Sequence, residues 1–191
     1  MTKAADGAVG GMLGNCKWTG VRLRDVLLAQ GLDKKKVFQD ADQFHLHMTG
    51  VDGYSMSIPL DVAVSTERDV LLCYAMNNKP LSRDHGFPLR VLVPAYVGAR
   101  SVKWVDSIEI KPYPSDSPWY KNIYRIWPKH INDHLKVPLH DANANVAAPP
   151  VECAPVNSLV LYPEDGATLS IAKTDNFEIK VSSELSEYIG H

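Results

Sequence analysis

The sequence predicts an α+β fold, in which one or two helices accompany several short strands without regular alternation of helix and strand. A helical spacing of apolar residues occurs early in the chain, and short alternating or apolar segments follow it over residues 44–110. The 191 residues are 22% charged and 45% hydrophobic, which are ordinary proportions for a folded protein and argue against disorder throughout.

Composition also narrows the possible partners. The chain carries 20 Lys and Arg against 22 Asp and Glu, and a net charge of -2 argues against a nucleic-acid-binding surface. No apolar run reaches the roughly 18 residues that a membrane span needs, and the glycine-rich start lacks the apolar centre of a secretory signal. Cys16, Cys73 and Cys153 are too few and too scattered for a disulfide framework or a Cys-rich zinc site.

The first regular elements can be read from periodicity. The segment VRLRDVLLAQGL predicts a helix, because Leu23, Val26 and Leu27 fall on one face and Gly31 can end it. The next segment, QFHLHMTG, alternates strictly and predicts a half-buried strand. Its apolar side holds Phe44, Leu46 and Met48, and its other side holds His45, His47 and Thr49.

The segment DVLLCYAMNNKPL predicts a β-hairpin. Asn77 and Asn78 can take the positive φ values of a tight turn, and Pro80 limits the returning strand. We expect LRVLVP and VKWVDSIEI to form two further strands. The second of these has Val102, Trp104, Ile108 and Ile110 on its apolar face, with Asp106 as a polar break, against Lys103, Ser107 and Glu109.

The last third of the chain differs in composition. Residues 112–135 are rich in aromatics and proline, and we expect them to pack onto the domain surface rather than form a core of their own. Residues 141–155 have the Ala, Asn and Pro content of a linker. Three strand-like pieces follow, NSLVLYP, ATLSIA and FEIKVSS, and predict the opening of an all-β domain. An immunoglobulin-like sandwich needs about seven strands, so we expect this second domain to be truncated.

Two basic segments are candidates for anion binding. The segment SRDHGFPLR sets two arginines, an aspartate and a histidine around a glycine and a proline, which suits a phosphate. A turn held by an Asp–Arg pair is an equally good interpretation of it. The segment VGARSVKW puts Arg100 and Lys103 beside small residues, so backbone N–H groups and positive charge can meet one anion. An ordinary junction of loop and strand is the alternative there.

Two further features of the sequence give weaker signals. In GVDGYSMS, Asp52 and Tyr54 flank Gly53, which by itself indicates a turn with a partly buried tyrosine. Several histidines, including the i, i+4 pair His130 and His134, invite a zinc interpretation. No Cys-x-x-Cys or His-Glu-x-x-His motif accompanies them, so surface or hydrogen-bonded histidines are the better interpretation.

Taken together, these segments resemble the molybdenum-cofactor domain of the sulfite oxidase family. The resemblance is carried by WTGVRLRDVLL, YSMSIPL, DVLLCYAMN, LSRDHGFPLRVLVP and VGARSVKW, in this order and spacing. It covers residues 8 to about 120 strongly, and PVNSLVLYPEDGATL resembles the start of that family's immunoglobulin-like dimerisation domain. Plant-type nitrate reductases share the cofactor domain, but IPLDVAV and SDSPWY favour the sulfite oxidase branch.

The resemblance implies a domain organisation and a set of site residues. It implies a partial molybdopterin-binding domain over 1–140, a linker over 141–155 and the start of a dimerisation domain over 156–191. The cofactor-binding positions of the family fall on Asp52, His85, Arg90, Ser101, Val102 and Lys103. The active-site tyrosine falls on Tyr54.

The chain also departs from the family pattern. The family's molybdenum-ligating cysteine lies in a Cys-Ala-Gly-Asn motif upstream of the matching region, and none of the three cysteines here corresponds to it. The substrate-binding arginines near that cysteine and a haem domain are also missing. We therefore expect a partial chain that supplies no metal ligand of its own.

By resemblance, the activity is the oxidation of sulfite to sulfate, with electrons passed to a cytochrome-type haem protein. The cofactor is molybdenum-molybdopterin, and any haem belongs to a domain outside this chain. The family also implies a homodimer located in the mitochondrial intermembrane space or in peroxisomes. The alternatives are a nitrate reductase-type domain and a fragment that contacts the cofactor without turnover.

Overall fold

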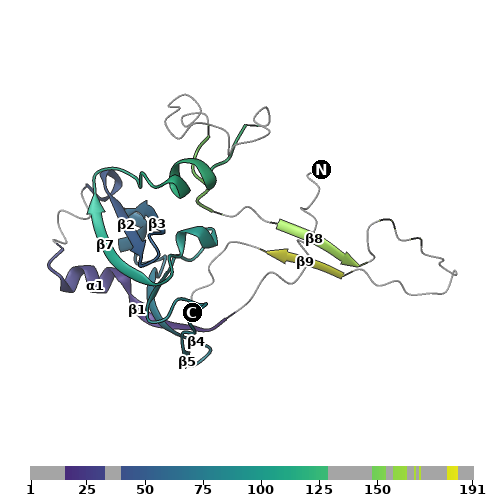
Figure 1. Ribbon diagram of the computed structural model, residues 1–191, viewed down its shortest axis with the longest axis horizontal. Helices are drawn as coiled ribbons and strands as arrows, with labels where there is room; N and C mark the ends of the chain where they lie inside the picture. The colour runs from purple at the N-terminus through teal and green to yellow at the C-terminus, as the bar shows by residue number, and fades with distance from the viewer. Residues whose placement is uncertain are drawn as a thin grey trace.

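The structure, a computed structural model, confirms a mixed arrangement of helices and small antiparallel sheets (Figure 1). It describes residues 16–32, 40–128 and 148–153, the strands 157–162 and 180–184, and the single positions Gly166 and Thr168. Within this part of the chain, no helix is long and apolar enough to cross a membrane.

The first sheet contains β1 (Trp18–Arg22), β4 (Leu71–Met76) and β5 (Lys79–Pro80) in that order, and β6 (Arg90–Leu92) also pairs with β4. The predicted hairpin is confirmed, because Asn77 and Asn78 link β4 to β5 with φ values of 51° and 62°. Cys73 of β4 is the register partner of both Gly20 on β1 and Arg90 on β6. These three residues therefore form one row across the sheet.

The second sheet has the order β3 (Ser55–Pro59), β2 (His45–Gly50) and β7 (Val105–Lys111). The expectation of a half-buried β2 is wrong, because His47 is only 5% exposed and its Nε2 lies 2.7 Å from the carbonyl oxygen of Tyr113. The chain after β7 folds back over this face: Ser115 N–H donates to the Ser57 hydroxyl at 2.7 Å. Both faces of β2 are consequently covered.

The start of β7 also differs from the prediction. The alternating pattern begins at Val102, but the strand begins at Val105 because Trp104 has a left-handed φ of 52°. The indole Nε1 of Trp104 donates to the carbonyl of Arg83 at 2.7 Å and fixes this bend. Val102 is buried in the hydrophobic core.

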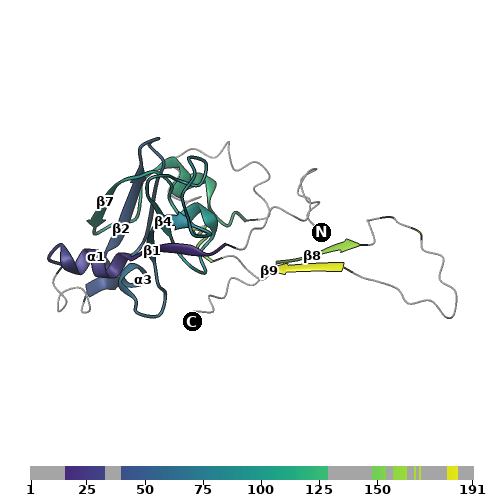
Figure 2. The same ribbon diagram turned by 90° about the horizontal axis from the view of Figure 1, so that it is seen from below.

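Within the described residues, the helices α1 (Leu23–Ala29) and α3 (Leu60–Val64) pack beside the sheets (Figure 2). The prediction for α1 is confirmed, including its end at Gly31, whose φ is 92°. The described residues also form two short 3₁₀ helices, η1 (Ala41–Gln43) and η2 (Gly98–Arg100), and the π-helix η3 (Trp119–Ile123). The core joins residues of both sheets and of α3, so it fixes how the loops at their ends meet.

The described part of the aromatic segment after β7 packs onto the body of the fold and forms no core of its own. Trp119 is 40% exposed, and Tyr120 is 6% exposed and joins the core of the sheets. The described part of the predicted linker, 148–153, pairs with the body through the bridges Tyr96–Cys153 and Arg125–Pro150. The domain boundaries remain predictions.

The last two strands form a separate antiparallel ribbon, β8 (Asn157–Tyr162) with β9 (Lys180–Glu184). The ribbon pairs with neither of the two sheets and projects away from them in both views (Figures 1 and 2). Both strands fall on segments with strand-like patterns, and the middle predicted piece lies outside the described residues except for Thr168. An immunoglobulin-like identity for this region remains a prediction.

Replacing Gly20 with alanine should destabilise the fold. A Cβ at this position would lie 2.3 Å from the Leu72 carbonyl oxygen and 2.8 Å from the Cys73 Cα, so β1 and β4 would have to separate. We expect the free energy of unfolding to fall by ~1–3 kcal/mol, the usual cost of overpacking. Gly98→Ala is the matched control, because a Cβ there meets nothing within 4 Å. Equal stabilities in urea denaturation would contradict the close approach of the two strands.

Candidate functional site

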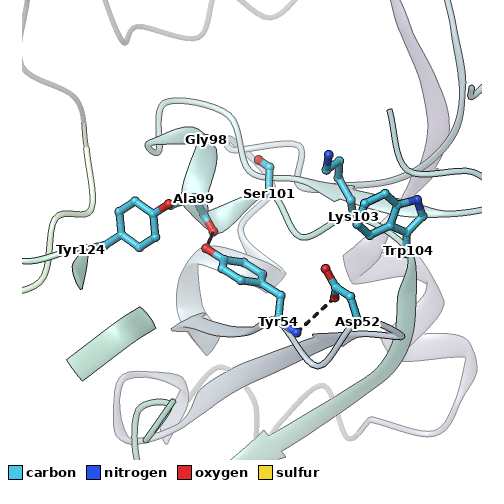
Figure 3. Close-up of a pocket in the computed structure, with 8 residues that line it drawn as sticks. All are labelled: Asp52, Tyr54, Gly98, Ala99, Ser101, Lys103, Trp104 and Tyr124. Atoms are coloured by element: carbon cyan, nitrogen blue, oxygen red, sulfur yellow. Dashed lines mark hydrogen bonds between the residues drawn. The ribbon is translucent and has the colours of Figure 1, made fainter. Parts of the chain in front are cut away.

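A pocket opens where the turn after β2, the η2 turn and the chain entering β7 come together (Figure 3). Four of the predicted site residues line it, and they come from two segments far apart in the sequence. The lining consists of Asp52, Tyr54, Gly98, Ala99, Ser101, Lys103, Trp104 and Tyr124.

Tyr54 forms one wall of the pocket and is held on several sides. Its hydroxyl donates to the Ala99 carbonyl at 2.9 Å, and its ring lies 5.5 Å from that of Trp119. Burial is the largest cause that raises the pKa of the phenol, and the neighbouring Tyr124 adds to the effect. Tyr54 is therefore a neutral hydrogen-bond donor over the whole physiological pH range.

Asp52 shapes the turn that carries Tyr54. Its Oδ1 accepts the backbone N–H of Tyr54 at 3.1 Å, and Gly53 between them has a φ of 81°, which favours glycine (Figure 3). The prediction of a turn with a partly buried tyrosine is confirmed. The exposed carboxylate keeps its second oxygen for other contacts.

The two predicted basic segments meet at Gly86. A Cβ on Gly86 would lie 3.1 Å from the Cβ atoms of both Arg90 and Lys103, and its φ is 105°. Arg90 Nη1 donates to the His85 carbonyl at 3.1 Å, and Lys103 Nζ donates to the Asp84 carbonyl at 2.9 Å. Of the three basic residues predicted for the site, Lys103 lines the pocket, and His85 and Arg90 do not.

His85 is exposed and bonds within its own loop, where its Nδ1 lies 2.6 Å from the Ser82 hydroxyl. The alternative of an Asp–Arg pair is not what holds this loop: the described contacts there contain no such ion pair. Trp104 Nε1 and Lys103 Nζ bind loop carbonyls instead. The carbonyls of Asp84 and Arg83 therefore already accept hydrogen bonds. Arg90 and Lys103 have no carboxylate partner among the described ion pairs.

Ser101 and Val102 occupy the strand-like run before Lys103. The Ser101 hydroxyl accepts the backbone N–H of Val93 at 3.1 Å, and the Val102 carbonyl accepts that of Val91 at 2.9 Å. Since the Val102 side chain is in the core, this run presents backbone and the Lys103 side chain rather than three side chains. The binding roles of all seven predicted residues remain predictions.

Arg90 provides the test of whether this region fits an anionic cofactor. Its guanidinium is partly buried, and Nε is covered with no hydrogen-bond partner among the described residues. The nearby Cys73 is a neutral thiol, because burial raises its pKa to about 11. Burial lowers the pKa of Arg90 itself, which reflects the cost of this charge without a counterion. The residues fit a ligand that brings negative charge, as the phosphate of a pterin does.

The expectation that Arg100 meets an anion together with Lys103 is wrong, because Arg100 is buried and does not line the pocket. It is 1% exposed, donates from Nε and Nη2 to the Val151 carbonyl at 3.2 and 2.8 Å, and lies 4.5 Å over the Tyr120 ring. Its neighbour Ala99 accepts the Tyr54 hydroxyl, so the η2 turn joins the pocket to segment 148–153. No local signal reveals a partner that lies 51 residues away.

The zinc interpretation finds no support in the described residues. No group of three or more His, Cys, Asp or Glu side chains there could hold a metal ion. His45 and His47 lie on β2, and burial lowers the pKa of His45. His130, His134 and His140 lie outside the described residues.

Comparison with known proteins identifies the class. Residues 1–119 match the family described as "Oxidoreductase molybdopterin binding domain". The chain belongs to this family, that of the sulfite oxidases, and its cofactor is molybdopterin.

Individual relatives agree with this assignment. The chain is 40% identical to "Sulfite oxidase, mitochondrial" of Drosophila melanogaster over 84% of its own length and 27% of that protein. It is 41% identical to the "Sulfite oxidase" of Arabidopsis thaliana over 63% of its length and 33% of that protein. It is also 34% identical to the "Nitrate reductase [NAD(P)H]" of Hordeum vulgare, over 84% of this chain and 18% of that protein. The chain thus spans about a third or less of these relatives.

The fold is shared with solved structures. The sulfane dehydrogenase SoxCD of Paracoccus pantotrophus superposes with a TM-score of 0.58 over 78% of this chain and 32% of that chain. At 21% identity this similarity bears on the fold alone.

Stability should decline in alkali. Burial raises the pKa of Tyr96 to about 12 and that of Tyr54 further, against ~10 for an unfolded tyrosine. The folded state keeps these protons to a higher pH, so the stabilisation is complete below pH ~10 and is lost as the pH rises through the folded values. Urea denaturation at pH 8 and pH 10.5 should show the loss, and Tyr96→Phe should reduce it. A variant that loses as much stability as the parent would contradict the assignment to Tyr96.

Proposed function

We propose that this chain is the cofactor-holding part of an enzyme that oxidises sulfite to sulfate. The observation that carries the proposal is the meeting of Arg90 and Lys103 at Gly86, two cations without a carboxylate partner among the described residues, next to the Tyr54 pocket. The chain belongs to the sulfite oxidase family, and the molybdopterin cofactor of that family is the anionic ligand that these two cations would bind.

The residues have distinct proposed tasks. When bound, the molybdenum cofactor supplies the oxygen atom that sulfite gains and accepts the two electrons that sulfite loses; water restores the oxygen and releases two protons. Arg90 and Lys103 bind the anionic part of the cofactor, and the backbone of Ser101 and Val102 lies alongside it. Asp52 and His85 contact its polar edge.

Tyr54 acts on the substrate side. Its hydroxyl turns from the Ala99 carbonyl to a sulfite oxygen and donates a hydrogen bond without adding negative charge. The rings of Trp119 and Tyr124 lie beside Tyr54 and limit the access of water to it. The substrate-binding arginines of the family have no counterpart among the predicted site residues.

The wider setting is proposed from the relatives. Fly and human relatives are named as mitochondrial sulfite oxidases, which supports a location in the mitochondrial intermembrane space. We propose a cytochrome-type protein as electron acceptor and a homodimer as the assembly of the complete protein. The β8–β9 ribbon, in the region predicted as a dimerisation domain, is the segment that would contribute to that contact.

Nitrate reduction is the second candidate, because the barley nitrate reductase matches 84% of the chain. The higher identities to the fly and Arabidopsis sulfite oxidases favour sulfite. The test uses the complete natural protein loaded with molybdenum. Sulfite-dependent reduction of cytochrome c without nitrate-dependent oxidation of a reduced viologen is the expected result. The reverse pattern would assign nitrate, and bound molybdenum with neither activity would assign a non-catalytic role.

Replacing Arg90 with alanine should reduce cofactor retention. A charged hydrogen bond is worth ~1.5–3 kcal/mol, so we expect the molybdenum content of the purified protein to fall at least about tenfold. Arg22→Ala is the control, because Arg22 is an exposed arginine whose contact is an ion pair with Asp69 at 2.7 Å. Full molybdenum content in Arg90→Ala would remove this residue from the binding site.

Replacing Tyr54 with phenylalanine should lower kcat/KM for sulfite while molybdenum content is unchanged. The ring and its contact with Trp119 stay, and only the hydroxyl is lost. A donor that meets developing charge is worth ~10²–10³ in rate; here the donor meets an existing anion, so we expect the lower end or less. Tyr74→Phe, at an exposed position on β4, is the control. Equal kcat/KM at matched loading would show that Tyr54 is a packing residue.

A further inference from the structure

We infer that Trp18 is a positioning residue that holds the Arg90 guanidinium in place for the anionic group of the cofactor. The guanidinium carbon of Arg90 lies 4.9 Å from the centroid of the Trp18 ring. The inference rests on the proposed role of Arg90, and it names a residue on β1 that the sequence motifs around Arg90 do not include.

The contact spans the first sheet. Trp18 is on β1 and Arg90 is on β6, and each of these strands pairs with β4 rather than with the other. The Arg90 side chain reaches β1 because the row it crosses has small residues. Cys73 is its register partner on β4, and Gly20 is the partner of Cys73 on β1.

An irregularity in β1 sets the position of Trp18. The register shifts between Thr19 and Gly20, and Gly20 approaches β4 so closely that a Cβ would lie 2.3 Å from the Leu72 carbonyl oxygen. Bulges redirect the side chains next to them. Trp18 directly precedes this bulge, so its ring lies over the end of Arg90 rather than along the edge of the sheet.

The type of contact suits a ligand-binding cation. The ring face attracts the guanidinium through its quadrupole and uses none of its N–H donors. Nη1 donates to the His85 carbonyl at 3.1 Å, Nη2 makes a long contact of 3.5 Å with the Ser101 carbonyl, and Nε has no partner among the described residues. A carboxylate in place of the ring would neutralise the charge and occupy the donors. Trp18 instead fixes the orientation of Arg90 and leaves charge and donors for the ligand.

Lys103, the other cation of the proposed site, also contacts a tryptophan ring. Lys103 Nζ lies 4.6 Å from the centroid of the Trp104 ring and donates to the Asp84 carbonyl. Arg90 and Lys103 are therefore each held by a tryptophan face and a backbone carbonyl, on the two sides of Gly86. Trp104 directly follows Lys103 in the chain, so this second contact is local. The contact of Trp18 with Arg90 joins two different strands and therefore carries the inference.

The main experiment compares Trp18→Leu, Trp18→Phe and Trp127→Leu in the complete protein. Molybdopterin is measured as its fluorescent oxidation product, and molybdenum by elemental analysis. We expect Trp18→Leu to lower both about three- to tenfold, a range set by the strength of a cation–π contact. Trp18→Phe keeps a ring face and should restore most of the content. Trp127→Leu makes the same change at a tryptophan whose Nε1 donates to the Asn122 carbonyl, and it should retain the full content.

Further readouts separate positioning from a general structural effect. In an Arg90→Ala background, Trp18→Leu should cause no additional loss of cofactor, because both changes remove one function. In the apoprotein, the ring current of Trp18 should shift the Nε–H resonance of Arg90, identified by its absence in Arg90→Lys, and Trp18→Leu should abolish that shift.

The outcomes are distinguishable. Undiminished cofactor in Trp18→Leu, a loss in Trp18→Phe equal to that in Trp18→Leu, or additive losses with Arg90→Ala would each overturn the inference. The absence of pterin from the parent protein would contradict the proposed function. The resonance measurement would still decide whether Trp18 holds Arg90. If Trp18→Leu does not fold, the pterin content of Trp18→Phe and the additivity of Trp18→Phe with Arg90→Ala decide in its place.

Discussion

The organisation of this site depends on positive charge that is not paired with a carboxylate in the part of the chain that the structure describes. Arg90, Lys103 and Arg100 are at least partly buried, and none is paired with a carboxylate among the described hydrogen bonds and ion pairs. A buried cation without a counterion is costly, and here carbonyl oxygens and aromatic faces reduce that cost. Such partners stabilise a charge without cancelling it, so the field remains available to an anion. Gly86, with its left-handed φ, lies against the side chains of Arg90 and Lys103, and Gly20 lies against Cys73, the register partner of Arg90.

The η2 turn extends this arrangement beyond the pocket. Adjacent residues of one short turn face different parts of the molecule: the Ala99 carbonyl accepts the Tyr54 hydroxyl, and the Arg100 guanidinium binds the Val151 carbonyl. Tyr120, in the core, lies under the same guanidinium. The η2 turn therefore connects segment 148–153 to the residue that Tyr54 contacts. Arg100 makes this connection through the Val151 carbonyl, whereas Lys103 lines the pocket itself.

The sequence allowed prediction of what depends on near neighbours. The helix at Leu23, the Asn77–Asn78 turn and the two basic segments follow from periodicity, turn chemistry and motif, and the structure contains each of them. The burial of His47 was not predictable, because the chain that covers it comes after β7. The contact of Arg100 with Val151 and that of Trp18 with Arg90 join residues far apart in the chain. Such contacts depend on how the sheets pack, and the spacing of residues along the sequence does not predict that packing.

Tyr54 stays protonated although a cation lies near it. A tyrosine near Arg100 would ordinarily ionise more readily, and that guanidinium does favour the phenolate. Burial outweighs it and raises the pKa of the phenol, with Tyr124 and Asp52 acting in the same direction. A phenolate at this position would cancel part of the positive field and repel an oxyanion at short range. Because Tyr54 stays neutral, its hydroxyl remains a hydrogen-bond donor, here to the Ala99 carbonyl, and it adds no negative charge to the pocket.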